Sequence, residues 1–231
     1  MPLPWRVFVT FIDLLSTRDF YLHIGASVKI LGIGWLVGAL SGWLIGLLIG
    51  LSVVMRRVLS PWLVLLFPIP KIALLPVFIL VFGISDTARI ATIMAGVFFP
   101  VVFCVYQGVR SVPLSLIEMG KTFGLTRLQQ VRMIVIPGVL PSTFLACRLT
   151  TAIGLILLVS AEMIGARYGI GAFILGAGSM AQMEQLFAGV LILSLFGLSL
   201  FMVWELLEKR LIHWKGQGNQ PGGTNDAASL V

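Results

Sequence analysis

The chain has 231 residues, of which 58% are hydrophobic and 11% charged, and its mean hydropathy is +1.05. Soluble domains carry about 25% charged residues, so this composition excludes an ordinary soluble enzyme and indicates one polytopic membrane domain. The formal net charge is +7. Because the basic residues lie in gaps between apolar segments, membrane orientation explains the charge better than nucleic-acid binding, and we expect no nucleic-acid partner.

The N-terminal segment, residues 1–27, is mildly amphipathic. Its apolar side chains gather on one side, and they are Trp5, Phe8, Phe11 and Leu15. Arg6 and Asp13 lie elsewhere on the same predicted helix. An amphipathic helix of this kind lies in the plane of the membrane interface. We therefore expect residues 1–27 to be an extracytoplasmic segment on the membrane surface.

Five apolar segments are long enough to cross a bilayer, which takes about 20 residues in a helix. They cover residues 28–55, 62–82, 88–109, 140–164 and 186–207. Backbone groups inside lipid must satisfy their own hydrogen bonds, so the expected fold is all-α, a polytopic membrane helical bundle. Residues 28–215 form its transmembrane domain. The Gly- and Asn-rich residues 216–231 are typical of a disordered tail.

Lysine and arginine are distributed unevenly between the two sides of the predicted bundle. One side carries Arg56, Arg57, Arg110, Lys121, Arg127, Arg132, Lys209, Arg210 and Lys215, and the other carries Arg89 and Arg167. Basic residues concentrate in cytoplasmic loops. The count therefore predicts that residues 110–139 and the C-terminus are cytoplasmic, and that residues 1–27 are outside.

Residues 118–137, EMGKTFGLTRLQQVRMIVIP, form a polar and basic stretch between the third and fourth spans. Pro113 can begin a helix, and Gly124 can adopt a positive φ that turns the chain. Apolar residues recur at helical spacing on both sides of that glycine. A solvated loop is the simpler interpretation, but a helix pair with apolar faces outside the bilayer favours a partner surface.

The spacing of landmarks in this stretch resembles the "EAA" cytoplasmic loop of ABC importer permeases. The similarity is greatest to the nitrate/sulfonate/taurine/bicarbonate branch, and it covers roughly residues 20 to 215. Further segments carry it, namely residues 67–84, 98–113, 139–149, 161–171 and 187–193. In that family the loop folds as two short helices that dock on an ATPase. The coupling residues implied are Glu118, Met119, Gly120, Thr122, Gly124, Ile134 and Pro137.

The resemblance also implies partners and a transport role. We expect an inner-membrane permease that imports a small anionic solute by alternating access, with no cofactor, no metal and no enzymatic activity of its own. The expected partners are the lipid bilayer, two copies of an ABC ATPase, a second permease copy and an extracytoplasmic solute-binding protein. An ion-coupled secondary transporter is the alternative, as is a membrane assembly protein without transport, although the first, third and fifth spans lack the mid-span ionisable residues of secondary transporters.

Two features depart from the family pattern. Met119-Gly120 stands where relatives usually carry Ala-Ala, and glycine costs a helix about 1 kcal/mol relative to alanine. Relatives usually have six spans, with a further span before the segment that corresponds to residues 1–21. Gly120-Lys121-Thr122 resembles the end of a phosphate-binding loop, but Ser115 replaces the required glycine, so ATP must bind to another subunit.

Two charged residues are candidates for the translocation path. Lys71 lies beside an apolar span, where a charge is costly and often functional. The alternative interpretation is that the Lys71 side chain only extends to the cytoplasmic edge of the membrane, where Pro68 and Pro70 break the helix. Glu162 ends the fourth span and could shape the outer mouth, or it could be a solvated carboxylate at a helix end.

Overall fold

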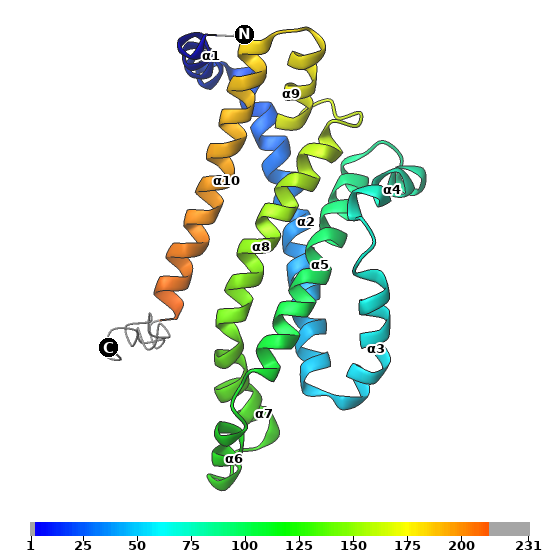
Figure 1. Ribbon diagram of the computed structural model, residues 1–231, viewed down its shortest axis with the longest axis vertical. Helices are drawn as coiled ribbons and strands as arrows, with labels where there is room; N and C mark the ends of the chain where they lie inside the picture. The colour runs from blue at the N-terminus through cyan, green and yellow to red at the C-terminus, as the bar shows by residue number, and fades with distance from the viewer. Residues whose placement is uncertain (1–2, 213–231) are drawn as a thin grey trace, which may run out of the picture.

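The structure is a computed structural model that describes residues 3–212, and every regular element in that range is a helix (Figure 1). Four helices of the described part are long and apolar enough to cross a membrane. They are α2 (Arg18–Leu51), α5 (Asp86–Arg110), the continuous helix Arg127–Glu162 and α10 (Met183–Leu211). The all-α membrane bundle is therefore confirmed. The predicted tail, residues 216–231, lies outside the described residues.

The second span is bent rather than continuous. The sequence predicts one helix over residues 62–82, but α3 (Val53–Leu66) is followed by a 3₁₀ turn, η1 (Lys71–Leu74), and then by α4 (Leu75–Phe82). The two halves meet at an angle of 88°. Pro68 and Pro70 lie in the break and cannot donate backbone hydrogen bonds, so the helix cannot continue through them. Residues 3–212 contain five spans if this bent pair counts as one.

The first span begins earlier than its hydropathy suggests. α2 begins at Arg18 rather than at residue 28 and ends at Leu51, where Ser52 caps the next helix by accepting a hydrogen bond from the Met55 N–H. Residues 18–27 are therefore helical and continuous with the span. A separate helix, α1 (Pro4–Ser16), precedes them and contacts the start of α10. Figure 1 shows α1 nearly end-on, so it runs across the direction of the long helices.

The core of the bundle is the contact between α2 and α5. A stripe of glycines on α2 faces α5, and it consists of Gly34, Gly38, Gly42, Gly46 and Gly50. Branched side chains of α5 fill it, namely Ile93, Val97, Val101, Val105 and Val109. Small residues four apart let two helix backbones approach closely. This stripe is ordinary helix packing, as the sequence favoured, and it does not line an open path.

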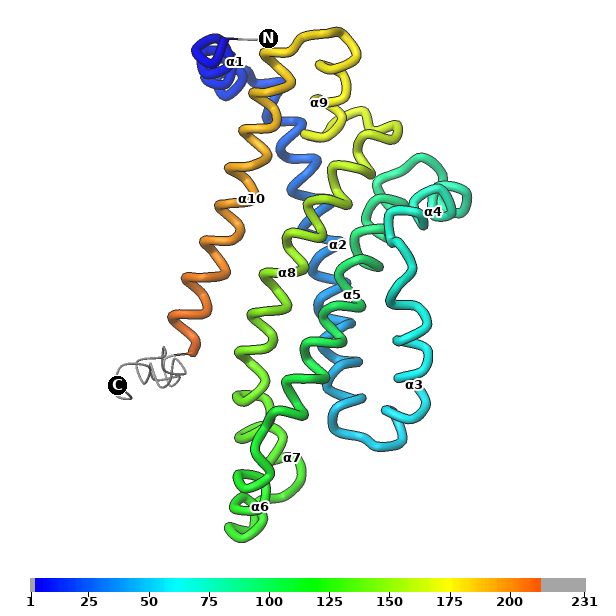
Figure 2. The backbone as a smooth tube through the Cα atoms, in the orientation of Figure 1, coloured from blue at the N-terminus to red at the C-terminus, as the bar shows by residue number. Residues whose placement is uncertain are grey.

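Three tryptophans connect the remaining helices to α8 (Ile136–Glu162). The indole N–H groups of Trp35 and Trp43 on α2 donate to Thr150 and Thr143 on α8, and Trp204 of α10 donates to Thr151. A buried indole is apolar except for this one donor, so each hydrogen bond fixes the position of a large ring. The short helix α9 (Ile170–Ser179) lies between α8 and α10 at one end of the bundle (Figure 2).

Candidate functional site

A helix pair extends beyond the ends of α5 and α8, at the bottom of Figure 1. Its first member is α6 (Leu114–Thr122), and its second begins as α7 (Arg127–Gln130). We call residues 113–137 the coupling loop. The opposite end of the bundle, which the charge count places outside, is called the outer end. Two helices joined by a turn are what the sequence predicts for this loop.

The turn between the two helices depends on Gly124. Its φ is +74°, a left-handed conformation that is easy only for glycine. The Gly124 N–H donates to the Lys121 carbonyl at 2.9 Å, and the Leu125 N–H donates to the Gly120 carbonyl at 3.0 Å. These two bonds form a Schellman motif, which ends a helix and satisfies its last carbonyls. Gly124 therefore fixes where α6 stops and in which direction the chain leaves.

The second helix begins at a capping box. The Thr126 N–H donates to the Gln129 Oε1 at 2.8 Å, and the Gln129 N–H donates to the Thr126 hydroxyl at 3.4 Å. Such a reciprocal pair satisfies two orphan donors at a helix start. Only the one residue Leu125 separates the left-handed glycine from the cap, so the loop has little freedom at its bend. The sequence carried this signal in Thr126 and Gln129, but sequence reasoning did not use it.

Gly120 explains the departure from the usual Ala-Ala. It is buried, and a Cβ at this position would lie 2.8 Å from the Ile134 Cδ1 and 3.4 Å from the Leu125 Cδ1. The first distance is shorter than side chains tolerate. Glycine therefore lets α6 lie directly on the second helix, so the close partner at this position is the chain itself.

Ile134 and Pro137 lie where the loop joins the membrane helix. The second loop helix is not a separate short helix, because α7 continues through a π-helical turn, η2 (Val131–Val135), into α8. The Ile136 N–H bonds back to the Val131 carbonyl, and Pro137 has no N–H to offer to the turn before it. A π-helical turn beside a proline is a recognised local response in an otherwise continuous helix. The second loop helix is therefore continuous with the membrane helix α8.

The outward face of the coupling loop is apolar. Its exposed large side chains are Leu114, Leu116, Met119, Phe123, Leu128 and Met133. Phe123 and Leu128 are each 77% exposed, although they flank the turn closely. Glu118 is exposed beside them, and the Thr122 hydroxyl donates to the Glu118 carbonyl at 3.1 Å. Large apolar side chains exposed outside the spans indicate a surface that another protein covers.

The Lys71 side chain is held at the break in the second span. Its Nζ folds back on this break and donates to the carbonyls of Leu66, Phe67 and Ile69 at 2.7, 3.0 and 2.7 Å. It also lies 4.5 Å from the centre of the Phe99 ring, near the midpoint of α5. An ammonium group has three donors, and all three are used here. A lysine at the cytoplasmic edge and a lysine on the translocation path both stay predictions.

Glu162 is not solvated, because its residue is only 1% exposed. Its carboxylate accepts hydrogen bonds from the Ser27 hydroxyl at 2.6 Å and from the Gly171 N–H at 2.8 Å. Ser27 accepts in turn from the Ile170 N–H at 2.9 Å, so the first turn of α9 is held against α2 and α8. Carboxylates are favourable at helix N-termini. The solvated alternative is wrong, and a role in the outer mouth stays a prediction.

Sequence reasoning missed two further features of this region. His23 Nδ1 lies 2.9 Å from the Gly169 carbonyl oxygen and 3.1 Å from the Gly169 N, so this ring also holds the loop before α9. Arg148 of α8 forms an ion pair with Glu208 of α10 and lies 5.4 Å from the Phe201 ring. Neither partner lies near in sequence, so spacing alone could not reveal the contacts.

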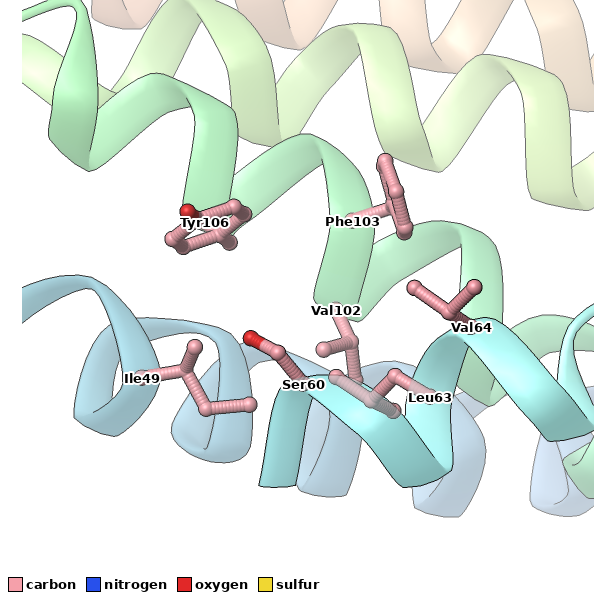
Figure 3. Close-up of a pocket in the computed structure, with 7 residues that line it drawn as sticks. All are labelled: Ile49, Ser60, Leu63, Val64, Val102, Phe103 and Tyr106. Carbon is pink, nitrogen blue, oxygen red and sulfur yellow. The ribbon is translucent and has the colours of Figure 1, made fainter. Parts of the chain in front are cut away.

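The bent span packs loosely on the bundle. A cavity of about 220 Å³ separates it from α2 and α5 (Figure 3). The lining side chains are Ile49, Ser60, Leu63, Val64, Val102, Phe103 and Tyr106. No residue of α3 is buried. Among residues 3–212, no group of three His, Cys, Asp or Glu side chains could hold a metal ion.

Comparison with known proteins identifies the family. A family model described as "Binding-protein-dependent transport system inner membrane component" matches residues 38–213. The chain belongs to this family. It is 33% identical over 93% of its length to the putative aliphatic sulfonates transport permease protein SsuC of Bacillus subtilis, of which it covers 78%. It is 28% identical over 94% of its length to the taurine transport system permease protein TauC of Escherichia coli, of which it covers 81%.

Solved structures agree with the family in fold. A chain of the MetNI methionine ABC transporter in an inward-facing conformation superposes with a TM-score of 0.69 at 19% identity, covering 82% of this chain and 94% of that one. The chain is thus a multi-pass inner-membrane permease of an ABC importer, a transport component rather than an enzyme. Family membership implies an ATPase and a binding protein as partners. The ion-coupled alternative is set aside.

Proposed function

We propose that the coupling loop of this permease docks on a separate ABC ATPase and that ATP hydrolysis there drives import. The observation that carries the proposal is the exposed apolar face around a bend that is fixed on both sides. Phe123 and Leu128 are exposed while Gly120 and Ile134 pack inside the loop. The loop therefore offers a preformed shape, and binding to it needs little ordering.

Transmission of the ATPase movement follows from the continuity of the second loop helix with α8. Because α7, η2 and α8 follow one another without a break, a displacement of the loop tilts α8. α8 in turn packs on α5 and hydrogen-bonds to the tryptophans of α2 and α10. Alternation between inward-open and outward-open states needs only a difference in how the ATPase stabilises the two arrangements.

The docking proposal is tested at the bend and at the exposed face. Gly124→Val places a β-branched residue in a left-handed turn and should release the ATPase from the permease while insertion continues. Phe123→Asp removes the most exposed ring and should act likewise, as should Glu118→Lys. Loss of a hot-spot side chain costs about 2 kcal/mol or more, which is on the order of a thirtyfold loss of affinity. Co-purification of the ATPase and uptake are the measurements.

Matched controls separate docking from folding. Gly32→Val alters a glycine of α2 with open space around it, and Ser115→Asp adds a carboxylate to an exposed polar site on α6. Both should retain ATPase binding. Full ATPase binding and uptake in Gly124→Val and Phe123→Asp would contradict the docking assignment.

We further propose that the transported solute is a small sulfonate-type anion. The support is the similarity to permeases named for aliphatic sulfonates and for taurine. Such a solute would be delivered by an extracytoplasmic binding protein to a path between two copies of this chain, each with one ATPase. Reconstituted complex should accumulate an alkanesulfonate in an ATP-dependent manner, and unlabelled nitrate should compete poorly. ATP-dependent uptake of nitrate but not of sulfonate would overturn this assignment.

A further inference from the structure

The N-terminal helix α1 carries two apolar stripes, and α10 accounts for only one of them. α1 packs on α10, and its inner stripe is buried or half-buried there, namely Val7, Phe11, Leu14 and Leu15. The second stripe is exposed, and it consists of Trp5, Phe8, Val9 and Ile12. These residues are spaced i, i+3, i+4 and i+7, so they form one continuous face of the helix.

The exposed stripe is too apolar for water. Trp5 is 72% exposed and Phe8 is 51% exposed, and their rings lie 6.3 Å apart in a row that continues to Phe11. Both charged side chains of α1 lie on a third face, which carries Arg6, Thr10 and Asp13. A helix with separate protein-facing, apolar and polar faces has three different surroundings. The inner face meets α10 and the polar face meets water, so the exposed apolar face needs a third environment.

The position of α1 identifies that environment. Arg6 lies 3.6 Å from Glu184, which is in the first turn of α10 just before its apolar run begins. α1 is therefore level with the outer boundary of that span, and it runs across the spans rather than along them (Figures 1 and 2). Tryptophan and other amphipathic aromatic rings concentrate at this depth.

We propose that Trp5, Phe8, Val9 and Ile12 are embedded in the outer leaflet, at the boundary between lipid headgroups and acyl chains, so that α1 anchors the start of α10 at a fixed depth. The occupant of this face is phospholipid rather than another protein. A helix in this orientation buries its apolar face roughly 5–10 Å into the interface. The inference is independent of which solute the permease carries.

Spin labels on the intact permease in proteoliposomes test the proposal. Single cysteines at Phe8, Ile12 and Asp13 are introduced after Cys104 and Cys147 are replaced by serine. Labels at positions 8 and 12 should collide with oxygen several-fold more often than with a water-soluble nickel chelate, while the label at position 13 should show the reverse ratio. Nickel access at positions 8 and 12 equal to that at 13 would overturn the proposal.

A protein partner would give a different outcome. Labels at positions 8 and 12 that are strongly immobilised and shielded from both reagents would indicate a covering protein, and this also overturns the proposal. If the labelled variants fail to assemble, a photo-reactive phenylalanine analogue at Phe8 in native membranes provides a second measurement. The expected product is a phospholipid adduct, and a cross-link to another polypeptide would contradict it.

Discussion

Lys71 shows how a basic residue within a span can still have hydrogen-bond acceptors for its ammonium group. Helix α3 ends with unpaired carbonyls, because Pro68 and Pro70 supply no N–H to continue it. The Lys71 ammonium donates to the Leu66 and Phe67 carbonyls at this helix end and to the Ile69 carbonyl just beyond it, and it places a positive charge at the negative end of the helix dipole. The residue that the sequence offered as a candidate for the translocation path thus has a structural task first.

The substitution Lys71→Met distinguishes a structural role at the end of α3 from a role in the translocation path. If Lys71 holds the break together, the Met variant should lose stability, by about 1–3 kcal/mol for carbonyls left without a donor, and uptake should fall with it. Lys71→Arg should restore most of both. The measurements are the unfolding midpoint of the purified complex and uptake in proteoliposomes.

Lys29→Met serves as the control, because Lys29 is exposed and its Nζ lies 3.5 Å from the Asp86 carboxylate. Exposed pairs of this kind contribute about 0–1 kcal/mol. Reduced uptake by Lys71→Met with an unchanged midpoint would instead favour the path, and an unchanged midpoint with normal uptake would exclude both roles.

At the scale of elements, the packing of α2 on α5 depends on glycines, which have no side chain to hold the two helices apart. A Cβ at Gly42 would lie 2.7 Å from the Phe98 carbonyl oxygen and 3.0 Å from the Val101 Cβ. Backbone cannot move aside as a flexible side chain can, so the helices would have to separate. Gly32, nearly three turns away on the same helix at about 3.6 residues per turn, has no neighbour within 4 Å.

Gly42→Ala and Gly32→Ala therefore form a matched pair. Overpacking a tight contact costs about 1–3 kcal/mol, so Gly42→Ala should lower the unfolding midpoint and raise proteolysis of the purified protein. Gly32→Ala should be neutral or slightly stabilising, because alanine favours helix by about 1 kcal/mol over glycine. Equal midpoints for the two variants would show that α2 and α5 can move apart at little cost.

The elements also show what sequence patterns can and cannot supply. Hydropathy located the spans approximately and Gly124 located the turn of the coupling loop, because both signals are local, but residues 62–82 were predicted as one helix although Pro68 and Pro70 lie in a break. Hydropathy did not locate the start of α2, since the amphipathic residues 18–27 are helical without being apolar throughout. It could not reveal that Glu162 reaches Ser27 or that Arg148 reaches Glu208, because each pair is joined only by the packing of distant helices.

The coupling loop was the most predictable part of the site, and its details still came from packing. Glycine at position 124 predicts a left-handed turn from sequence alone. Position 120 is different. From sequence alone a glycine there predicts only a less stable helix, and the structure is needed to show that Ile134 packs against it. Local chemistry sets the turn, whereas the contact between the two loop helices sets which side chains remain exposed.

At the scale of the whole molecule, the two ends of the bundle are built differently. The end that the lysine and arginine count assigns to the cytoplasm carries the exposed apolar coupling loop and most of the basic residues. At the other end the Ile170 and Gly171 N–H groups donate to Ser27 and Glu162, His23 contacts Gly169, and α1 lies across this end. This arrangement fits a permease that receives force at one end while the other keeps its shape.

Orientation in the membrane is the prediction on which all of these roles depend. The lysine and arginine count places the coupling loop inside and the connection between α4 and α5 outside. Gln129 is exposed in the coupling loop, and Asp86 is exposed at the start of α5, near the opposite end of the bundle. Single cysteines at these two positions, without Cys104 and Cys147, should therefore behave oppositely in intact cells. A membrane-impermeant maleimide should label position 86 directly and position 129 only after the membrane is permeabilised. Labelling of position 129 in intact cells would place the coupling loop outside, where no ATPase could reach it.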